Sequence, residues 1–149
     1  MKSIVVAVDL LPKTSAVLKI AKNFSKAFDA KLFIIHSEYI GTYINSVISD
    51  APNHPYTELI NDLKKNIKSQ LAEMKKKLLE ENIEVESILM DGLTIENILE
   101  EANNVNADLI IIGSHKHGKL YHFLFGSIHN ALINKSTVPI MIIPNNYKE

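Results

Sequence analysis

Several residue types are missing from this chain of 149 residues, and each absence removes a class of chemistry. There is no cysteine, which excludes a disulfide framework, a thiolate nucleophile and a cysteine-ligated zinc site. All sixteen basic residues are lysine, so bidentate recognition of phosphate or guanine by arginine is excluded as well. An anion site in this protein would therefore rely on backbone N–H groups and lysine charges.

Long apolar runs are missing too. No segment reaches the length of about 18 uninterrupted apolar residues that a membrane-spanning helix requires. The opening segment MKSIVVAVDLL superficially resembles a secretory signal, but Asp9 interrupts its apolar run and no small-residue cleavage site follows. We therefore expect a cytoplasmic protein without a membrane segment.

The overall composition indicates one folded domain. Hydrophobic residues make up 46% of the chain and charged residues 22%, which are ordinary values for a globular protein. A chain of this length buries roughly two thirds of the surface that its unfolded form exposes. We expect residues 1–149 to form a single domain with one main site.

Short apolar runs alternate with helical patterns along the chain. Four of the runs are continuous and rich in β-branched residues, as is typical of strands buried on both faces of a parallel sheet; they lie at 4–8, 32–35, 109–112 and 138–143, and a more alternating run lies at 85–90. Between them, apolar residues recur every three or four positions, which predicts helices over 14–28, 55–78, 94–102 and about 127–134. This alternation predicts an α/β fold: a doubly wound, Rossmann-like, five-stranded parallel sheet with helices on both faces.

The predicted topology selects two places for a ligand. In open α/β sheets, ligands bind beyond the carboxyl ends of the strands, where the chain reverses its winding direction. That rule selects Asp9, after the first strand, and Gly113, at the end of the fourth. Asp9 can accept from a ribose hydroxyl or hold a phosphate-bound Mg²⁺, although a turn or helix-capping role explains it equally well.

Gly113 begins the segment GSHKHGKLYHFLFGS, which has glycine at both ends and no acidic residue. Gly126 and Ser127 precede a predicted helix, whose first N–H groups and positive dipole end favour an anion. Taken alone, an ordinary helix cap explains these two residues. The segment also fits most of a P-loop, but Leu120 stands where the magnesium-binding hydroxyl is required, and no G-x-G-x-x-G occurs in the chain.

Three other functions have little support from the residues. A metal site built from the histidines of this region is disfavoured because no carboxylate lies between residues 109 and 148; these histidines are His115, His117, His122 and His129. Catalysis is disfavoured because no nucleophile, base and orienting group occur at a motif spacing. A net charge of −1 without arginine and without a basic patch carrying aromatics weighs against nucleic-acid binding.

Five segments together resemble the universal stress protein family over essentially the whole chain: VVAVD, IIHS, ADLIIIGSHKHG, LFGS and VPIMIIP. The most specific feature is similar to that family's nucleotide loop, written G-x-x-G, nine residues, then G-S/T. Gly113 takes the first glycine, Lys116 stands in place of the second, and Gly126 with Ser127 completes the loop.

The resemblance implies a stress-response module that binds ATP, with Mg²⁺, signals through its bound state and hydrolyses ATP slowly at most. Phosphate contacts are implied for Gly113, Lys116, Gly126, Ser127 and Ile128. Nucleoside contacts are implied for Ala7, Val8, Asp9, Ser37 and Ile112. The resemblance also suggests a homodimer through the last strand, 138–143, whose apolar edge would favour pairing.

Lys116 is the departure from the family pattern. Its side chain could crowd the phosphates or place an ammonium on them. The alternative function is therefore an interaction protein of the same fold that does not bind ATP and acts through its dimer surface. A third hypothesis, a nucleotidyl transferase or ATP hydrolase, requires a turnover that falls when Asp9 or Lys116 is replaced.

Overall fold

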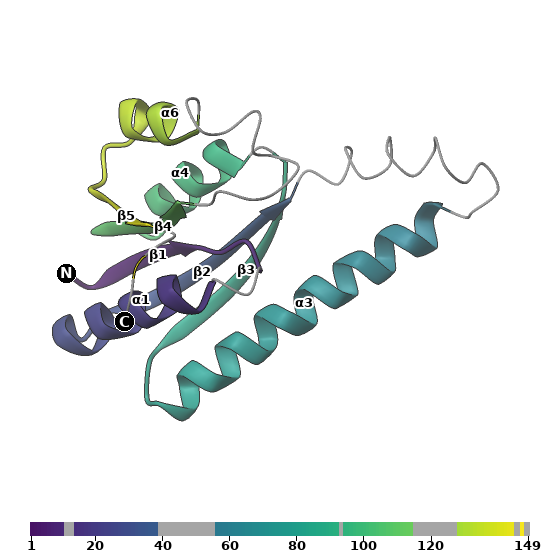
Figure 1. Cartoon of the computed structure of the whole chain (residues 1–149), viewed down its shortest axis with the longest axis horizontal. Coiled ribbons are helices and arrows are strands. Elements are labelled where there is room, and N and C mark those ends of the chain that lie inside the picture. Colours follow the sequence, from purple (N-terminus) through teal and green to yellow (C-terminus); the bar gives the residue numbers. More distant parts are fainter. Residues whose placement is uncertain (11–13, 39–55, 93, 115–127, 145–146, 148–149) are drawn as a thin grey trace.

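The computed structural model describes the chain except for residues 11–13, 39–55, 93, 115–127, 145–146 and 148–149. Strands and helices alternate along the described part, as the sequence predicts (Figure 1). The strands are β1 (Ser3–Ala7), β2 (Lys31–Glu38), β3 (Val85–Asp91), β4 (Leu109–Ser114) and β5 (Ile140–Pro144). The helices are α1 (Thr14–Phe28), α3 (Tyr56–Glu80), α4 (Thr94–Asn104) and α6 (Ile128–Lys135).

The five strands form one parallel sheet in the order β3-β2-β1-β4-β5. From β1 the chain moves outward through β2 to β3, and it then returns to the other side of β1 to form β4 and β5. The winding direction therefore reverses between β1 and β4. This order confirms the doubly wound five-stranded sheet and places the reversal between the two strands that the sequence selected.

Helices cover both faces of the sheet. Helices α1 and α3 lie on one face, and α4 and α6 lie on the other (Figure 1). Successive residues of β1 belong to the two cores in turn: Ile4 and Val6 pack under α1 and α3, whereas Val5 packs under α4 and α6. All three side chains are fully buried, which is why the central strands read as continuous apolar runs.

Residues that tolerate the left-handed backbone region end two of the helices. Asp29 follows α1 with φ 51°, and Asn82 follows α3 with φ 60°; short polar side chains adopt this conformation more readily than others. The turns are closed by backbone hydrogen bonds, such as the one from the N–H of Ile83 to the carbonyl of Leu78 at 3.0 Å. Each turn directs the chain into the next strand.

The last strand begins later than its apolar run predicts. The pattern indicated a start at residue 138, but β5 begins at Ile140. The Ser136 hydroxyl donates to the Val138 carbonyl at 2.7 Å and accepts from the Val138 N–H at 3.1 Å, and Pro139 has no N–H to offer the sheet. Pairing with β4 starts where the Ile110 N–H donates to the Pro139 carbonyl.

The longest helix in the described part of the chain is α3, with 25 residues. It buries Ile67, Leu71 and Leu78 and carries exposed ion pairs such as Lys77 with Glu73 at 2.7 Å. Among the residues that the structure describes, no helix is both long enough and apolar enough to cross a membrane.

Candidate functional site

The carboxyl ends of β1, β2 and β4 lie next to one another at one edge of the sheet. This edge is formed by the ends of the strands and not by an outer strand. Ala7 pairs with Ile35 of β2 and with Ile112 of β4. Because all three strands run in the same direction, the residues that follow these positions leave the sheet together. This arrangement gathers the candidates for which the structure describes a position: Ala7, Val8, Asp9, Ser37, Ile112 and Gly113.

The remaining candidates belong to the segment between β4 and α6. Lys116, Gly126 and Ser127 lie outside the described residues. Ile128 is the first residue of α6, although the position of its side chain is not described. The helix therefore begins directly after the Gly126-Ser127 pair, as the sequence predicts.

Gly113 lies within β4, not in the connection after it. It pairs with Ile143 of β5, and its backbone is extended, since the positive-φ glycine within the described ranges is Gly92. A role for Gly113 therefore does not depend on an unusual backbone angle. Because it has no side chain, a ligand could approach its backbone closely.

The turn after β1 is held from two sides. The Val8 N–H donates to the Ile35 carbonyl at 2.9 Å, and Nδ1 of His36 lies 2.8 Å from the Val8 carbonyl. Because a carbonyl only accepts, this nitrogen carries the hydrogen. Leu10 then adopts a left-handed conformation with φ 59°, which costs about 1–2 kcal/mol for a residue of this kind.

Asp9 lies between these two constraints. Its carboxylate oxygen Oδ2 is buried, and the preceding peptide is held by His36. The backbone on both sides of Asp9 is thus fixed by contacts with β2 and by an unusual turn angle. Strained backbone of this kind persists where the surrounding structure over-determines it, and it is common at ligand sites.

A second polar cluster joins the ends of β2 and β3 to helix α4. Asn97 is 8% exposed, and its Nδ2 donates to Oγ of Ser37 at 2.7 Å and to the carbonyl of Asp91 at 3.3 Å. The Ser37 hydroxyl is 3.5 Å from the carbonyl of Gly92, whose φ is 117°. The buried amide therefore fixes both the serine and the turn that leaves β3.

Sequence reasoning missed His36 and Asn97 as parts of the site. Both are polar residues at buried positions, with each side chain 8% exposed. The available signal was a polar residue inside an apolar pattern: His36 extends the buried run of the second strand, and Asn97 lies beside Ile98 on the inner face of α4. That signal marks a buried polar contact but does not reveal its partner.

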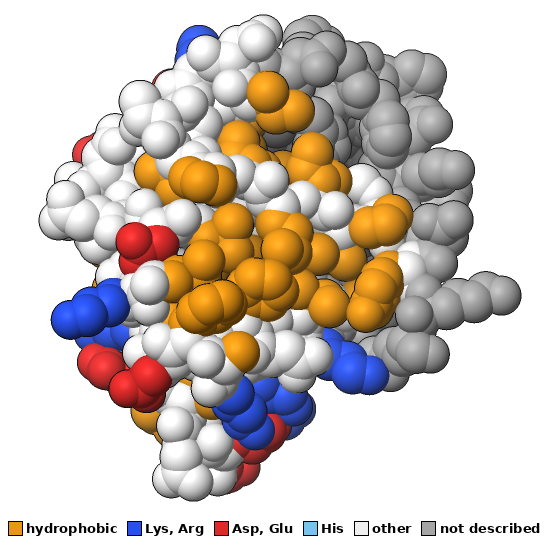
Figure 2. Space-filling view, turned by 90° about the vertical axis from the view of Figure 1, so that its left-hand side faces the viewer, with side chains coloured by type: hydrophobic (Ala, Val, Ile, Leu, Met, Phe, Trp, Pro, Cys, Tyr) orange, Lys and Arg blue, Asp and Glu red, His pale blue; other side chains and the backbone are white. Residues whose placement is uncertain are grey.

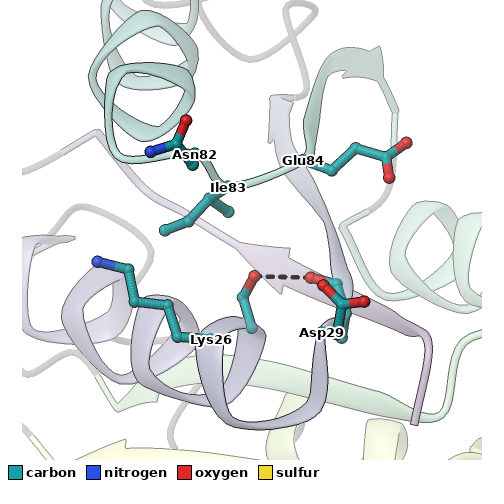
Figure 3. Close-up of a pocket in the computed structure, with 7 residues that line it drawn as sticks. Lys26, Asp29, Asn82, Ile83 and Glu84 are labelled. Atoms are coloured by element: carbon teal, nitrogen blue, oxygen red, sulfur yellow. Dashed lines mark hydrogen bonds between the residues drawn. The ribbon is translucent and has the colours of Figure 1, made fainter.

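A cavity of about 160 Å³ lies at the opposite edge of the sheet, between the end of α1 and the turn from α3 to β3 (Figure 3). Its lining residues are Ser25, Lys26, Asp29, Ala30, Asn82, Ile83 and Glu84. Ser25 donates to the Ala30 carbonyl at 2.6 Å, and Lys26 pairs with Glu81 at 3.0 Å. The first contact closes the turn after α1, and the second connects α1 to the turn after α3, so we assign this region a structural role.

Ion pairs in the same region shift the pKa values of their members. The pKa of Glu81 lies below its ordinary value because Lys22 and then Lys26 donate hydrogen bonds to the carboxylate. The pKa of Lys31 is raised by hydrogen bonds to Glu86 and Glu84. All of these groups are at the end of the sheet remote from Asp9 and Gly113.

The described residues hold no ready-made metal cluster. Within the described ranges, no three side chains of histidine, aspartate or glutamate lie close enough together to hold an ion. His115, His117 and His122 lie outside those ranges, and the side chain of His129 is not described. The sequence-based suggestion that Asp9 holds a cation brought by a phosphate group stays a prediction.

The chain is similar to known proteins over nearly its full length. The profile of the universal stress protein family (Usp) matches residues 1–144. The stress response protein NhaX of Bacillus subtilis is 27% identical, over 95% of this chain and 89% of that protein. Universal stress protein A homolog 2 of Coxiella burnetii is 30% identical, over 95% of this chain and 94% of that protein.

Solved structures share the fold. The hypothetical protein MJ0577 superimposes with a TM-score of 0.79 at 24% identity, covering 99% of this chain and 98% of that chain. A universal stress protein in complex with cAMP gives 0.69 at 18% identity, with coverage of 97% and 98%. The universal stress protein from Archaeoglobus fulgidus in complex with dAMP gives 0.64 at 22% identity, with coverage of 96% and 98%.

The family's profile covers residues 1–144 of the 149, and the solved structures share the fold over nearly the whole chain. The chain belongs to the universal stress protein family.

Proposed function

We propose that this protein is a stress-response module that binds ATP with Mg²⁺ at the carboxyl ends of β1, β2 and β4. The observation that carries the proposal is the register of Ala7 with Ile112. It brings Asp9 and Gly113 to the same edge at the point where the winding reverses, which is where α/β sheets bind ligands. Relatives of the same fold in complex with cAMP and dAMP support an adenine nucleotide as the ligand class.

The proposed site has a phosphate side and a nucleoside side. The phosphate side uses backbone N–H groups at Gly113 and at the start of α6, where the helix dipole favours an anion; its residues are Gly113, Lys116, Gly126, Ser127 and Ile128. The nucleoside side consists of Ala7, Val8, Asp9, Ser37 and Ile112. Asp9 supplies a hard oxygen ligand that suits a phosphate-bound Mg²⁺.

We propose that the bound state carries the signal and that hydrolysis is slow at most. Nucleophilic catalysis needs a nucleophile within reach of a base that a third group orients. Positioned acid–base catalysis needs a titratable group near the reacting atoms. The sequence shows no nucleophile, base and orienting group at a motif spacing. We therefore assign Asp9 the role of holding the cation and not that of a catalytic base.

The proposed assembly is a homodimer through β5. This strand is an outermost strand of the sheet. Figure 2 shows a broad area of apolar side chains on that side of the molecule. Ile142 is 37% exposed, and Ile140 and Met141 are half-buried. An exposed apolar edge strand with unpaired backbone groups favours pairing with a second copy. The strand itself spans Ile140–Pro144 in the structure, where the sequence indicated 138–143, and we propose that this strand pairs with that of a second copy.

The single domain over residues 1–149 and the cytoplasmic location remain predictions from the sequence and form part of this proposal.

The alternative proposal is an interaction protein that binds no ATP and acts through its β5 surface. Lys116 favours that alternative, because it replaces a glycine of the family's loop with a long charged side chain.

The deciding experiment is a thermal melt with and without Mg-ATP, after any co-purified nucleotide has been removed and identified. ATP at about a hundredfold over its dissociation constant stabilises the protein by about 2.7 kcal/mol, a shift of roughly 5–11 °C for a domain of this size. Gly126→Val should abolish the shift, because a β-branched side chain blocks the phosphate approach. Lys76→Ala, on the exposed side of α3, is the control and should shift like the parent.

Lys116→Gly separates the two proposals. If the parent shows no shift and releases no nucleotide while Lys116→Gly gains a shift, then the lysine closes the pocket and the alternative function holds. A parent shift that persists in Gly126→Val would mean that ATP binds elsewhere.

A further inference from the structure

Asn97 commits both hydrogens of its side-chain amide to neighbouring groups. One goes to Oγ of Ser37 at 2.7 Å and the other to the carbonyl of Asp91 at 3.3 Å. The carbonyl determines which way the amide faces, because a carbonyl can only accept a hydrogen bond. The group that faces Ser37 is therefore also the amide nitrogen, and Ser37 accepts from it.

This contact leaves the Ser37 hydroxyl with a hydrogen to donate. A hydroxyl carries one hydrogen and two lone pairs, and Asn97 occupies one lone pair. The Gly92 carbonyl is 3.5 Å from Oγ, well beyond the usual distance of about 2.7–2.8 Å between two oxygens. A ligand acceptor at the usual distance would therefore accept the hydrogen bond of the Ser37 hydroxyl in place of the Gly92 carbonyl.

The position of Ser37 indicates which part of a ligand would meet it. In the sheet, β1 lies between β4 and β2, and neighbouring strands are about 4.8 Å apart. Phosphates at Gly113 of β4 would put the ribose over β1 and the group furthest from the phosphates over the end of β2. In a nucleotide, that group is the base.

Helix α4 holds this hydroxyl in place through the side chain of Asn97. Asn97 is buried and belongs to the helix that packs on the face opposite to α1. Through the Asp91 carbonyl, the same amide also holds the turn at Gly92, where φ is 117°. The serine, the end of β3 and the helix are thus one connected unit.

From these contacts we propose that Asn97 is a positioning residue that fixes Ser37 as a hydrogen-bond donor to an unprotonated ring nitrogen of the bound base. The inference rests on the proposed nucleotide function and deepens it, because it assigns the selection of the base to a serine and to an amide 60 residues further along the chain. The ligand class is a purine nucleotide with an acceptor nitrogen at the edge that faces β2.

The test measures the affinity of the full chain for Mg-ATP and for its 1-deaza, 3-deaza and 7-deaza analogues, each of which replaces one ring nitrogen by a C–H group. The parent should bind one analogue about tenfold more weakly than ATP, as expected when one hydrogen bond is lost. In Ser37→Ala, ATP itself should bind about tenfold more weakly, and the difference between ATP and that analogue should vanish.

Two variants test the amide. In Asn97→Asp the carboxylate takes the Ser37 hydrogen, so discrimination between ATP and the analogue should vanish as it does in Ser37→Ala. In Asn97→Ala the Ser37 hydroxyl turns freely, so the discrimination between ATP and the analogue should shrink. This second variant keeps the test valid if the aspartate variant does not fold. A purely structural role would weaken binding of ATP and of all the analogues by the same factor.

The outcomes separate the two levels of the proposal. A parent that binds ATP and the three analogues equally well overturns the inference and leaves nucleotide binding intact. Discrimination that survives in Ser37→Ala or stays complete in Asn97→Ala also overturns it. A parent that binds neither ATP nor any analogue overturns the proposed function itself, and the inference with it.

Discussion

His36 and Val8 are joined across β2 and β1 by a hydrogen bond in which the imidazole Nδ1–H donates to the backbone carbonyl at 2.8 Å. The histidine side chain is buried, with 8% exposed. The bond holds the last peptide before Asp9, so the histidine supports the edge at which the nucleotide is proposed to bind. Its role there is positional.

Replacing His36 by leucine should destabilise the protein by about 1–3 kcal/mol, because the buried Val8 carbonyl loses its side-chain donor. Urea denaturation at neutral pH measures this loss. His36→Asn is the matched control, since its amide nitrogen can occupy a position close to that of Nδ1 and should retain part of the bond. Equal stability of the leucine variant and the parent would show that this contact contributes nothing.

Gly92→Ala should cost about 1–3 kcal/mol through backbone strain. A methyl group at this position would meet its nearest neighbour, Nδ2 of Asn97, at 3.8 Å, which is ordinary contact. The cost therefore arises from the φ of 117°, a region that residues with a side chain rarely adopt. Denaturation curves give the loss; a variant as stable as the parent would mean that the turn relaxes without cost.

Ile142→Lys should convert a dimer of the protein into a monomer. A charge on the exposed part of β5 would have to be buried against the second copy without a partner, which is strongly unfavourable. Light scattering after size-exclusion chromatography should give the mass of one 16.7 kDa chain. Leu79→Lys is the control, since Leu79 is 50% exposed on α3. Dissociation by both variants or by neither would contradict a β5 interface.

Asp108 should make stability depend on pH in the acid range. Its carboxylate accepts hydrogen bonds from the N–H groups of Lys2 and Ser3, and these lower its pKa from the ordinary value. A lowered folded-state pKa means that the contribution is complete above the unfolded value of about 3.9 and is lost as the pH falls through the folded value.

Asp108→Asn removes the charge and keeps an acceptor. The parent should therefore be more stable than this variant at neutral pH, and the difference should narrow as the pH falls below about 4. Chemical denaturation at a series of pH values measures it. A difference that stays constant over the whole range would show that the ionised carboxylate has no special role.

Most of the fold could be predicted from the sequence. Runs such as the one around Ile110 are uninterrupted because both faces of a central parallel strand are covered by helices, and this burial leaves a direct pattern in the residues. The reversal between β1 and β4 followed from the order of the elements and the right-handed crossovers. Asp9 and Gly113 were selected by the same rule, which depends on topology more than on individual side chains, and their role in binding stays a prediction.

Two kinds of feature were decided only by the tertiary structure. The start of β5 depends on how Ser136 and Pro139 use their backbone groups, a local detail that hydrophobicity does not record. The partners of the buried polar residues depend on strand order and register: His36 meets a carbonyl 28 residues away, and Asn97 meets a hydroxyl 60 residues away.

By itself, the sequence of this protein determined which segments are buried, and therefore the layers of the fold and the two strands between which the winding reverses. Burial is a property of each residue type and repeats with the period of the helix or strand, so a single chain displays it. The polar contacts that shape this edge, His36 with Val8 and Asn97 with Ser37, were decided only when packing brought distant residues within hydrogen-bonding distance. A hydrogen bond is directional and short, and its partner is therefore chosen by the three-dimensional arrangement.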